Sequence, residues 1–230
     1  MKKVGIVGGL GPASTIDYYR EIIEICRKVN GNDNYPEIVI DSMNMGELVI
    51  GIETHNYNSV ANQILNSISN LQKAGASFAA IASNSPHIIW DLIIDKTCIP
   101  LVSIIDATCD YIAQHNYKKV LIFATKFTME NGLYSNALKN RSIGWILPNK
   151  EDIEILGNII YPNLENGIVI EEDKQKMILI AEKYIKQYSA DSILLGCTEI
   201  PLMIKSGDVS VPVINSTRIH IEKICEILLH

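Results

Sequence analysis

The first half of the chain contains a sequence pattern that returns in the second half in the same order. The segment KKVGIV at residues 2–7 comes back as KKVLIF at residues 118–123, an offset of 116 residues. Ala76 matches Ala190 and Ser83 matches Cys197, both at an offset of 114. The segment IPLVS at 99–103 also matches VPVIN at 211–215. Matches in one order at nearly one offset predict two similar lobes, whereas the alternative is that any two α/β units share such runs.

Short apolar runs rich in β-branched residues alternate with longer amphipathic stretches. Continuous apolar runs separated by helical patterns are typical of parallel sheets covered on both faces. The predicted strands are 3–7, 37–41, 78–82, 101–104, 119–124, 192–196 and 211–214, and the predicted helices include 16–29, 59–74, 129–138, 173–188 and 218–229. The predicted fold class is α/β, with two pseudo-symmetric lobes that are each a mostly parallel sheet flanked by helices. The expected lobes are residues 1–105 plus 216–230 and residues 106–215.

The composition restricts the kinds of partner. Of 230 residues, 47% are hydrophobic, and 20 Lys and Arg stand against 26 Asp and Glu, a net charge of −6 that leaves no basic surface for nucleic acid. No apolar run reaches the roughly 18 residues of a membrane span, and the N-terminal MKKVGIVGG indicates a strand and a turn instead of a signal peptide. We therefore expect a cytoplasmic protein. The histidines show no ligand spacing, so we expect no metal site. Four of the five cysteines are expected to be inert core thiols: Cys26, Cys98, Cys109 and Cys225.

Two polar stretches follow predicted strands at corresponding positions of the repeat. Ser83 lies in IASNSPHIIW at 81–90, and Cys197 lies in LLGCTEIPLM at 194–203. Ligands of open parallel sheets bind beyond the carboxyl ends of the strands. Two such side chains, facing each other across a cleft between the lobes, could remove a proton from one face of a carbon atom and return one to the other. Cys197 is a base only as a thiolate, so we expect free N–H groups of the following helix to lower its pKa.

The turns after the predicted strands supply further candidate residues. The glycine turn GGLGP at 8–12 either holds a carboxylate with its backbone amides or only turns the chain. The polar residues at the starts of the helices either bind a substrate or cap the helix. The acidic residue Glu199 orients the Cys197 thiol, accepts an ammonium group of the substrate, or only complements the helix dipole. The candidate substrate-binding residues are Gly9, Leu10, Gly11, Asn84, Ser85, Thr125, Lys126, Thr198 and Glu199.

Three motifs together resemble the aspartate/glutamate racemases that need no cofactor. They are GIVGGLGPASTIDYYREI at 5–22, SNSPH at 83–87 and GCTEIPLMI at 196–204, and the resemblance covers essentially the whole chain. It implies two pseudo-symmetric lobes with the active site in the cleft between them, a homodimer, and no pyridoxal phosphate. It also implies that the acid/base pair is Cys197 and Ser83, which exchange the Cα proton of a small amino acid.

The chain departs from this family at the first catalytic position. Where the family usually reads CNT, this sequence has Ser83, Asn84 and Ser85. A serine hydroxyl can donate a proton to a carbanion, but its alkoxide is costly to form, so Ser83 is a better acid than base. Two alternatives stay open: Ser83 replaces a natural cysteine by engineering, or the protein is a weak or inactive relative that binds an amino acid or a related carboxylate.

The side-chain specificity is less well defined by the sequence. A dicarboxylic amino acid requires a cation, which the family often supplies from the loop after the second strand and from a later segment. The chain has no Lys or Arg from Val29 to Gln72, and the later segment YPNLENG at 161–167 carries Glu165 in place of such a cation. Lys126 and His55 are the remaining candidates. Aspartate or glutamate is the expected substrate, and a neutral or differently charged amino acid remains the alternative.

Overall fold

The computed structural model describes residues 2–230, which form two compact units. The first unit contains the described residues up to Ile104 together with Thr217–His230, and the second contains Ile105–Ser216. Each unit has one four-stranded sheet in which all pairings are parallel. No helix among the described residues is long and apolar enough to cross a membrane.

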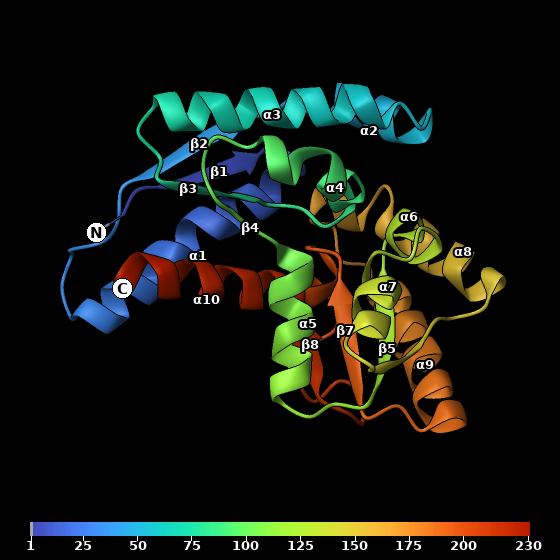
Figure 1. The fold of residues 1–230 in the computed structure, drawn as a ribbon. Coiled ribbons are helices and arrows are strands. Elements are labelled where there is room, and N and C mark those ends of the chain that lie inside the picture. Colours follow the sequence, from blue (N-terminus) through green and yellow to red (C-terminus); the bar gives the residue numbers. More distant parts are fainter. Residues whose placement is uncertain (1) are drawn as a thin grey trace. The chain divides into compact units, whose positions relative to one another are not determined.

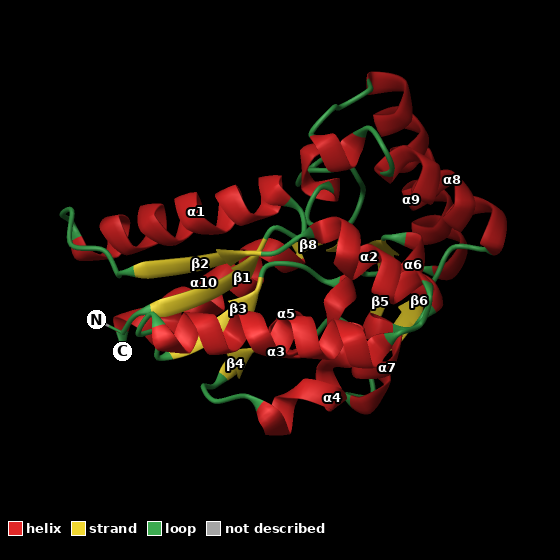
Figure 2. Cartoon of the chain, turned by 90° about the horizontal axis from the view of Figure 1, so that it is seen from above, coloured by secondary structure: helices red, strands yellow, loops and turns green. Residues whose placement is uncertain are grey.

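The strands of the first unit lie in the order β2-β1-β3-β4, as Figure 2 shows. They are β1 (Val4–Gly8), β2 (Ile38–Ser42), β3 (Phe78–Ile81) and β4 (Leu101–Val102). The helices of this unit are α1 (Pro12–Asn30), α2 (Met45–Glu53), α3 (Tyr57–Lys73), α4 (Trp90–Ile93) and α10 (Ser216–Leu229), which begins at the last residue of the second unit. Short 3₁₀ helices cover Ser85–Ile89 and Ile94–Lys96.

The central strands of the first unit are buried on both faces. Every residue of β1 and β3 is buried, as the continuous apolar runs predict. Helices α1 and α10 cover one face and α3 covers the other (Figure 1). On the α3 side, a Cβ atom at Gly5 would lie 2.9 Å from the Cβ of Leu71. Because only glycine leaves that space, Gly5 allows α3 to approach the strand closely.

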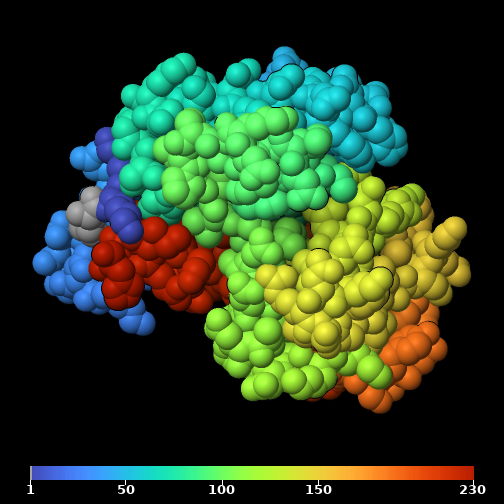
Figure 3. Space-filling view, viewed as in Figure 1, coloured from blue at the N-terminus to red at the C-terminus, as the bar shows by residue number. Residues whose placement is uncertain are grey.

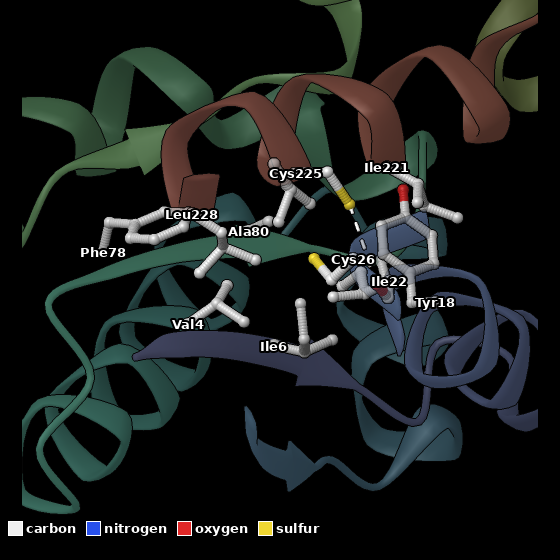
Figure 4. Close-up of a cluster of buried hydrophobic side chains, with 12 residues drawn as sticks. Val4, Ile6, Tyr18, Ile22, Cys26, Phe78, Ala80, Ile221, Cys225 and Leu228 are labelled. Carbon is white, nitrogen blue, oxygen red and sulfur yellow. Dashed lines mark hydrogen bonds between the residues drawn. The ribbon is translucent and has the colours of Figure 1, made fainter. Parts of the chain in front are cut away.

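The face under α1 and α10 forms a continuous hydrophobic core, shown in Figure 4. Side chains of alternate strand residues, such as Val4 and Ile6, point to this face. The other members are Tyr18, Ile22, Cys26, Phe78, Ala80, Ala82, Ile221, Ile224, Cys225 and Leu228. In Figure 3 the atoms of α10 lie beside those of α1 at the surface of this unit. The C-terminal helix therefore completes the core of the first unit.

A buried histidine fixes α10 to the sheet. The Nδ1 atom of His220 lies 2.6 Å from the hydroxyl of Tyr18, and its Nε2 atom lies 3.0 Å from the carbonyl oxygen of Val102. A carbonyl only accepts, so Nε2–H donates to Val102 and Nδ1 accepts from Tyr18 in the neutral ring. Burial, together with the smaller effect of the nearby His87, lowers the pKa of His220 to about 3. The ring is therefore neutral in the folded protein near pH 7.

The second unit repeats the strand order of the first as β6-β5-β7-β8. Its strands are β5 (Lys119–Ala124), β6 (Gly144–Ile146), β7 (Ser192–Gly196) and β8 (Val213–Asn215). Its helices are α5 (Ile104–Gln114), which begins at the last residue of the first unit, α6 (Lys126–Glu130), α7 (Leu133–Asn140), α8 (Lys150–Ile160) and α9 (Glu171–Tyr188). Two 3₁₀ helices cover Leu164–Asn166 and Ile200–Leu202. The α/β class and the parallel sheets are confirmed, and β3 and β7 occupy the same place in their sheets.

The sequence patterns did not predict β6. This strand has three residues, of which Gly144 and Trp145 are exposed, so it lacks a buried apolar run. It forms because Lys119, Val120 and Leu121 of β5 pair with it. The predicted strand at 101–104 is also shorter in the structure, where β4 contains only Leu101 and Val102.

The buried His220 predicts a loss of stability in acid. An unfolded His titrates near pH 6.5, whereas the folded pKa is about 3. The neutral ring therefore contributes stability above about pH 6.5, and this contribution falls as the pH drops toward 3, by at most about 1.4 kcal/mol per pH unit. Urea unfolding of His220→Gln should show a flatter pH dependence than the wild type between pH 6.5 and 4. The exposed His115→Gln is the control, and equal slopes in all three proteins would contradict this role of His220.

Candidate active site

Cys197 directly follows β7 and is held by a buried carboxylate. Its thiol donates a hydrogen bond to Oε2 of Glu199 across 3.2 Å, and the Thr198 hydroxyl donates to the same oxygen across 2.6 Å. Glu199 is 8% exposed and Cys197 is 4% exposed. The chain turns sharply after Glu199, where the N–H of Leu202 donates to the Glu199 carbonyl. The end of β7 therefore presents a thiol, a hydroxyl and a carboxylate within one hydrogen-bonded group.

The surroundings of Cys197 favour the protonated thiol. Burial raises the pKa of Cys197 well above its ordinary value, and the negative charge of Glu199 raises it further. The backbone N–H groups of Glu199 and Ile200 bond to the sulfur and act in the opposite direction. The expectation of a lowered pKa is therefore wrong for this structure, although the predicted N–H groups are present. The following helix is a single 3₁₀ turn, Ile200–Leu202, and its effect is smaller than that of burial.

The exposed thiol of the chain is a different residue. Cys98 is exposed, whereas Cys26, Cys109, Cys197 and Cys225 are buried. The expectation of a core thiol is therefore wrong for Cys98, which lies in the turn before β4. For the other three the expectation is confirmed, and burial raises the pKa of each one.

Tyr134 of α7 lies beside Cys197, and no sequence motif indicated it. Its ring is 1% exposed, and a Cβ atom at Gly196 would lie 2.7 Å from ring atom Cε2. Its hydroxyl group bonds with the side chains of Ser216 and Thr108, and Cys197 lies within electrostatic range. Burial raises the pKa of Tyr134 far above its ordinary value. The glycine of the GCTE motif therefore leaves room for this ring, which supports the turn that carries Cys197.

Ser83 lies two residues beyond β3 and is partly buried. The hydroxyl of Ser14 in α1 donates to the carbonyl oxygen of Ala82 across 2.8 Å and so fixes the chain immediately before Ser83. Asn84 is 3% exposed and makes no side-chain capping bond to the 3₁₀ helix that begins at Ser85. Helix capping therefore does not explain the Asn84 side chain. Ser85, the third predicted residue of this stretch, is partly buried.

The glycine turn after β1 is folded against the first turn of α1. Gly9 has a φ of +81°, and a Cβ there would lie 2.5 Å from the carbonyl oxygen of Met43, so glycine is required. The N–H of Gly9 donates to the Thr15 hydroxyl across 2.9 Å, and that hydroxyl donates to the Gly11 carbonyl across 3.1 Å. Because the Gly9 amide already donates to Thr15, Gly9 fits the interpretation that the glycine turn only turns the chain. Leu10, also predicted to bind substrate, is 5% exposed.

The candidate cations are already engaged. Lys126 is the first residue of α6, and its amine forms an ion pair with Glu154 of α8. Thr125 caps the same helix by accepting the N–H of Thr128 across 3.2 Å. The Nδ1 atom of exposed His55 lies 3.0 Å from the hydroxyl of Tyr57. Capping therefore explains Thr125, and Glu154 neutralises the charge of Lys126.

Among residues 2–230, no group of three or more His, Cys, Asp or Glu side chains is arranged to hold a metal ion. Each unit instead carries a small nucleophilic or hydroxyl side chain after the third strand in the chain order of that unit. These are Ser83 after β3 and Cys197 after β7. In chemical terms, the described side chains offer proton donors and acceptors.

Comparison with known proteins identifies the family. The profile of the Asp/Glu/Hydantoin racemase family matches residues 7–224. The broad specificity amino-acid racemase of Bacillus subtilis (strain 168) is 24% identical over 217 residues, which are 93% of this chain and 92% of that protein. The crystal structure of an aspartate racemase homologue from Pyrococcus horikoshii OT3 is 37% identical, covers both chains completely and superposes with a TM-score of 0.88.

A more distant structure shares the fold. The aspartate racemase of Picrophilus torridus is 24% identical, covers 98% of this chain and 95% of its own, and gives a TM-score of 0.75. The family profile and the Pyrococcus horikoshii structure together include both sheets and the segments that carry Ser83 and Cys197. The chain belongs to the Asp/Glu/Hydantoin racemase family.

Proposed function

We propose that the protein is an amino-acid racemase that uses only its own side chains as acid and base. The observation that supports this most strongly is the thiol of Cys197, which is hydrogen-bonded to the buried carboxylate of Glu199 in a chain of the racemase family. Ser83 occupies the corresponding place after β3 and acts as the second acid/base group. The substrate is an α-amino acid, and neither pyridoxal phosphate nor a metal takes part.

The reaction begins with the loss of the thiol proton. Oε2 of Glu199 lies 3.2 Å from the sulfur and accepts this proton, which leaves a thiolate beside a neutral carboxyl group. This transfer moves the single negative charge from the carboxylate to the sulfur. It therefore never places two adjacent anions in the buried site, where they would be costly. The thiolate then removes the Cα proton of the substrate, and Ser83 donates a proton to the opposite face. Water returns a proton to the Ser83 alkoxide and takes the proton held by Glu199, which restores the starting state. Reversal of these steps handles the other enantiomer.

A second candidate function is amino-acid binding without turnover. The hydroxyl of Ser83 and the raised pKa of Cys197 both favour it, because neither group is readily deprotonated near pH 7. The intact Cys197–Glu199 hydrogen bond favours the racemase instead. Incorporation of deuterium at Cα in heavy water, with a panel of L- and D-amino acids, distinguishes the two. A binding protein exchanges no Cα proton.

Removal of the Cys197 thiol should abolish exchange. In Cys197→Ala, both enantiomers of a substrate should keep their Cα proton, because the group that removes it is missing. ¹H NMR in heavy water measures the loss of the Cα signal. Cys98→Ala changes an exposed thiol outside the site and should exchange at the wild-type rate. Exchange that survives in Cys197→Ala would exclude Cys197 as the base.

Removal of the Glu199 charge should make the Cys197 thiol more reactive toward alkylation. The carboxylate raises the pKa of this thiol, so Glu199→Gln should lower it and increase the thiolate fraction about tenfold for each pKa unit. The alkylation rate of Cys197 with iodoacetamide, followed by peptide mass spectrometry between pH 7 and 10, should shift to lower pH. Cys98 in the same sample is the internal control. A profile that moves to higher pH would contradict the electrostatic role of Glu199.

The two acid/base groups should give the enantiomers different exchange behaviour. The enantiomer whose Cα–H points to Cys197 should exchange quickly without inversion, whereas its mirror image must lose its proton to a serine alkoxide. Overall racemisation should therefore be slower than this exchange. The equilibrium constant between enantiomers is one, so kcat/KM is equal in both directions.

Replacement of Ser83 by cysteine tests this asymmetry. Ser83→Cys should accelerate racemisation much more than the exchange at the Cys197 face, because a thiolate forms more readily than an alkoxide. Polarimetry gives the racemisation rate, and NMR gives the exchange rate. If racemisation in the wild type is already as fast as exchange, Ser83 does not limit the second proton transfer.

A further inference from the structure

The carbonyl group two residues before Cys197 is held by a buried serine. The hydroxyl of Ser216, the first residue of α10, donates to the Leu195 carbonyl oxygen across 2.8 Å. Ser216 is completely buried, so this bond is shielded from solvent. It adds a side-chain contact to the strand pairing of Leu195 with Asn215 of β8. The backbone near the end of β7 is therefore fixed immediately before the turn that carries the thiol.

Gly196, the next residue, is packed closely on two sides. A Cβ atom there would lie 2.7 Å from Cε2 of the Tyr134 ring and 3.2 Å from the Cβ of Ala124 in β5. The first distance is too short for a real contact, so the ring and the neighbouring strand leave no space for a side chain. The backbone that leads into Cys197 therefore rests directly against the ring of Tyr134.

The Tyr134 hydroxyl connects these two contacts. It bonds with the side chains of Ser216 and Thr108, and Thr108 of α5 is also completely buried. The one hydroxyl hydrogen of Ser216 goes to the Leu195 carbonyl, which can only accept, so Ser216 accepts the hydrogen of Tyr134. The oxygen of Tyr134 in turn accepts from Thr108. The hydrogen bonds therefore run in one direction toward the Leu195 carbonyl, and the members of such a chain strengthen one another.

We propose, on the basis of the proposed racemase function, that Tyr134 is a positioning residue for the thiol of Cys197. Its ring supports Gly196 and its hydroxyl holds Ser216 on the preceding carbonyl, so the thiol keeps the geometry in which it donates to Glu199. Proton transfer requires this geometry, because a base acts only within hydrogen-bond reach of the proton. A displacement of about 1 Å can lower the rate about 100-fold. In this role Tyr134 acts through the backbone and exchanges no proton with the substrate.

Loss of the Tyr134 hydroxyl should slow the exchange of the Cα proton without weakening substrate binding. Tyr134→Phe keeps the ring but interrupts the hydrogen bonds at their centre. With the amino acid of the panel that the wild type exchanges fastest, kcat should fall at least about tenfold while KM stays within about twofold. Tyr184→Phe is the matched control, because it removes a buried hydroxyl of the same unit that donates to Asp152 across 2.7 Å. It should keep the wild-type kcat, and urea unfolding measures the stability of both variants.

Two further variants break the same support at other points. Ser216→Ala removes the bond to the Leu195 carbonyl, and Gly196→Ala forces the turn away from the Tyr134 ring. Each should lower kcat in the same way as Tyr134→Phe and leave KM within about twofold. The double variant of Tyr134→Phe with Ser216→Ala should be about as slow as Ser216→Ala alone, because both changes interrupt one chain of bonds. Fully additive effects of the two changes would overturn the single chain.

The reactivity of the thiol separates this proposal from the racemase function. If no amino acid of the panel exchanges in the wild type, the racemase function fails, and alkylation of Cys197 with iodoacetamide between pH 7 and 10 then decides the role of Tyr134. Burial holds the pKa of this thiol high, so a displaced thiol that gains contact with water is alkylated at lower pH. A shift to lower pH in Tyr134→Phe and Ser216→Ala, without a shift in Tyr184→Phe, supports the positioning role.

Two results would overturn the proposal. The first is an unchanged kcat in Tyr134→Phe and Ser216→Ala of an active protein, or an equal loss of kcat in Tyr184→Phe. The second is an alkylation profile of Cys197 that is the same in the wild type and in both variants. A loss of stability alone, with kcat and the alkylation profile unchanged, would show that Tyr134 only supports the fold.

Discussion

The hydrogen bond from the Cys197 thiol to the buried Glu199 carboxylate is the interaction on which the chemistry depends. It joins the group that must lose a proton to one that can accept it, inside a site with little access to water. The same carboxylate opposes the formation of a second anion next to it. A thiol in this position is therefore inert toward solvent but prepared for proton transfer within the site. The surrounding fold, from β7 to the Tyr134 ring packed at Gly196, keeps these groups in place.

Much of the architecture followed from elementary patterning. Apolar runs such as those at β1, β3 and β7 need cover on both faces, which in parallel sheets comes from the connecting helices. The repeat predicted two similar lobes, and the two sheets have the same strand order. The same reasoning placed Ser83 and Cys197 just beyond equivalent strands. Such features depend on periodicity and on the sense of the strands, and both can be read from the sequence.

Other features depend on tertiary contacts and could not be predicted in this way. Strand β6 is too short and too exposed to give an apolar run, and it exists through its pairing with β5. Tyr134 carries no motif, and its place beside Cys197 arises from the packing of α7 at a glycine. The direction in which the pKa of Cys197 shifts depends on how deeply the thiol is buried. The effect of burial outweighs that of the backbone N–H groups, which the sequence did indicate. The engagement of Lys126 by Glu154 likewise requires the structure.

A crystal structure of the Cys197→Ser variant with a bound α-amino acid would test the account most directly. The serine hydroxyl stands in for the thiol and slows turnover. We predict that the Cα atom lies about 3–4 Å from the side-chain oxygen of the residue at position 197, that Ser83 lies on the opposite face of Cα, and that the α-ammonium group lies beside Glu199. An amino acid bound away from the end of β7, or with its Cα turned away from both side chains, would contradict the proposed chemistry.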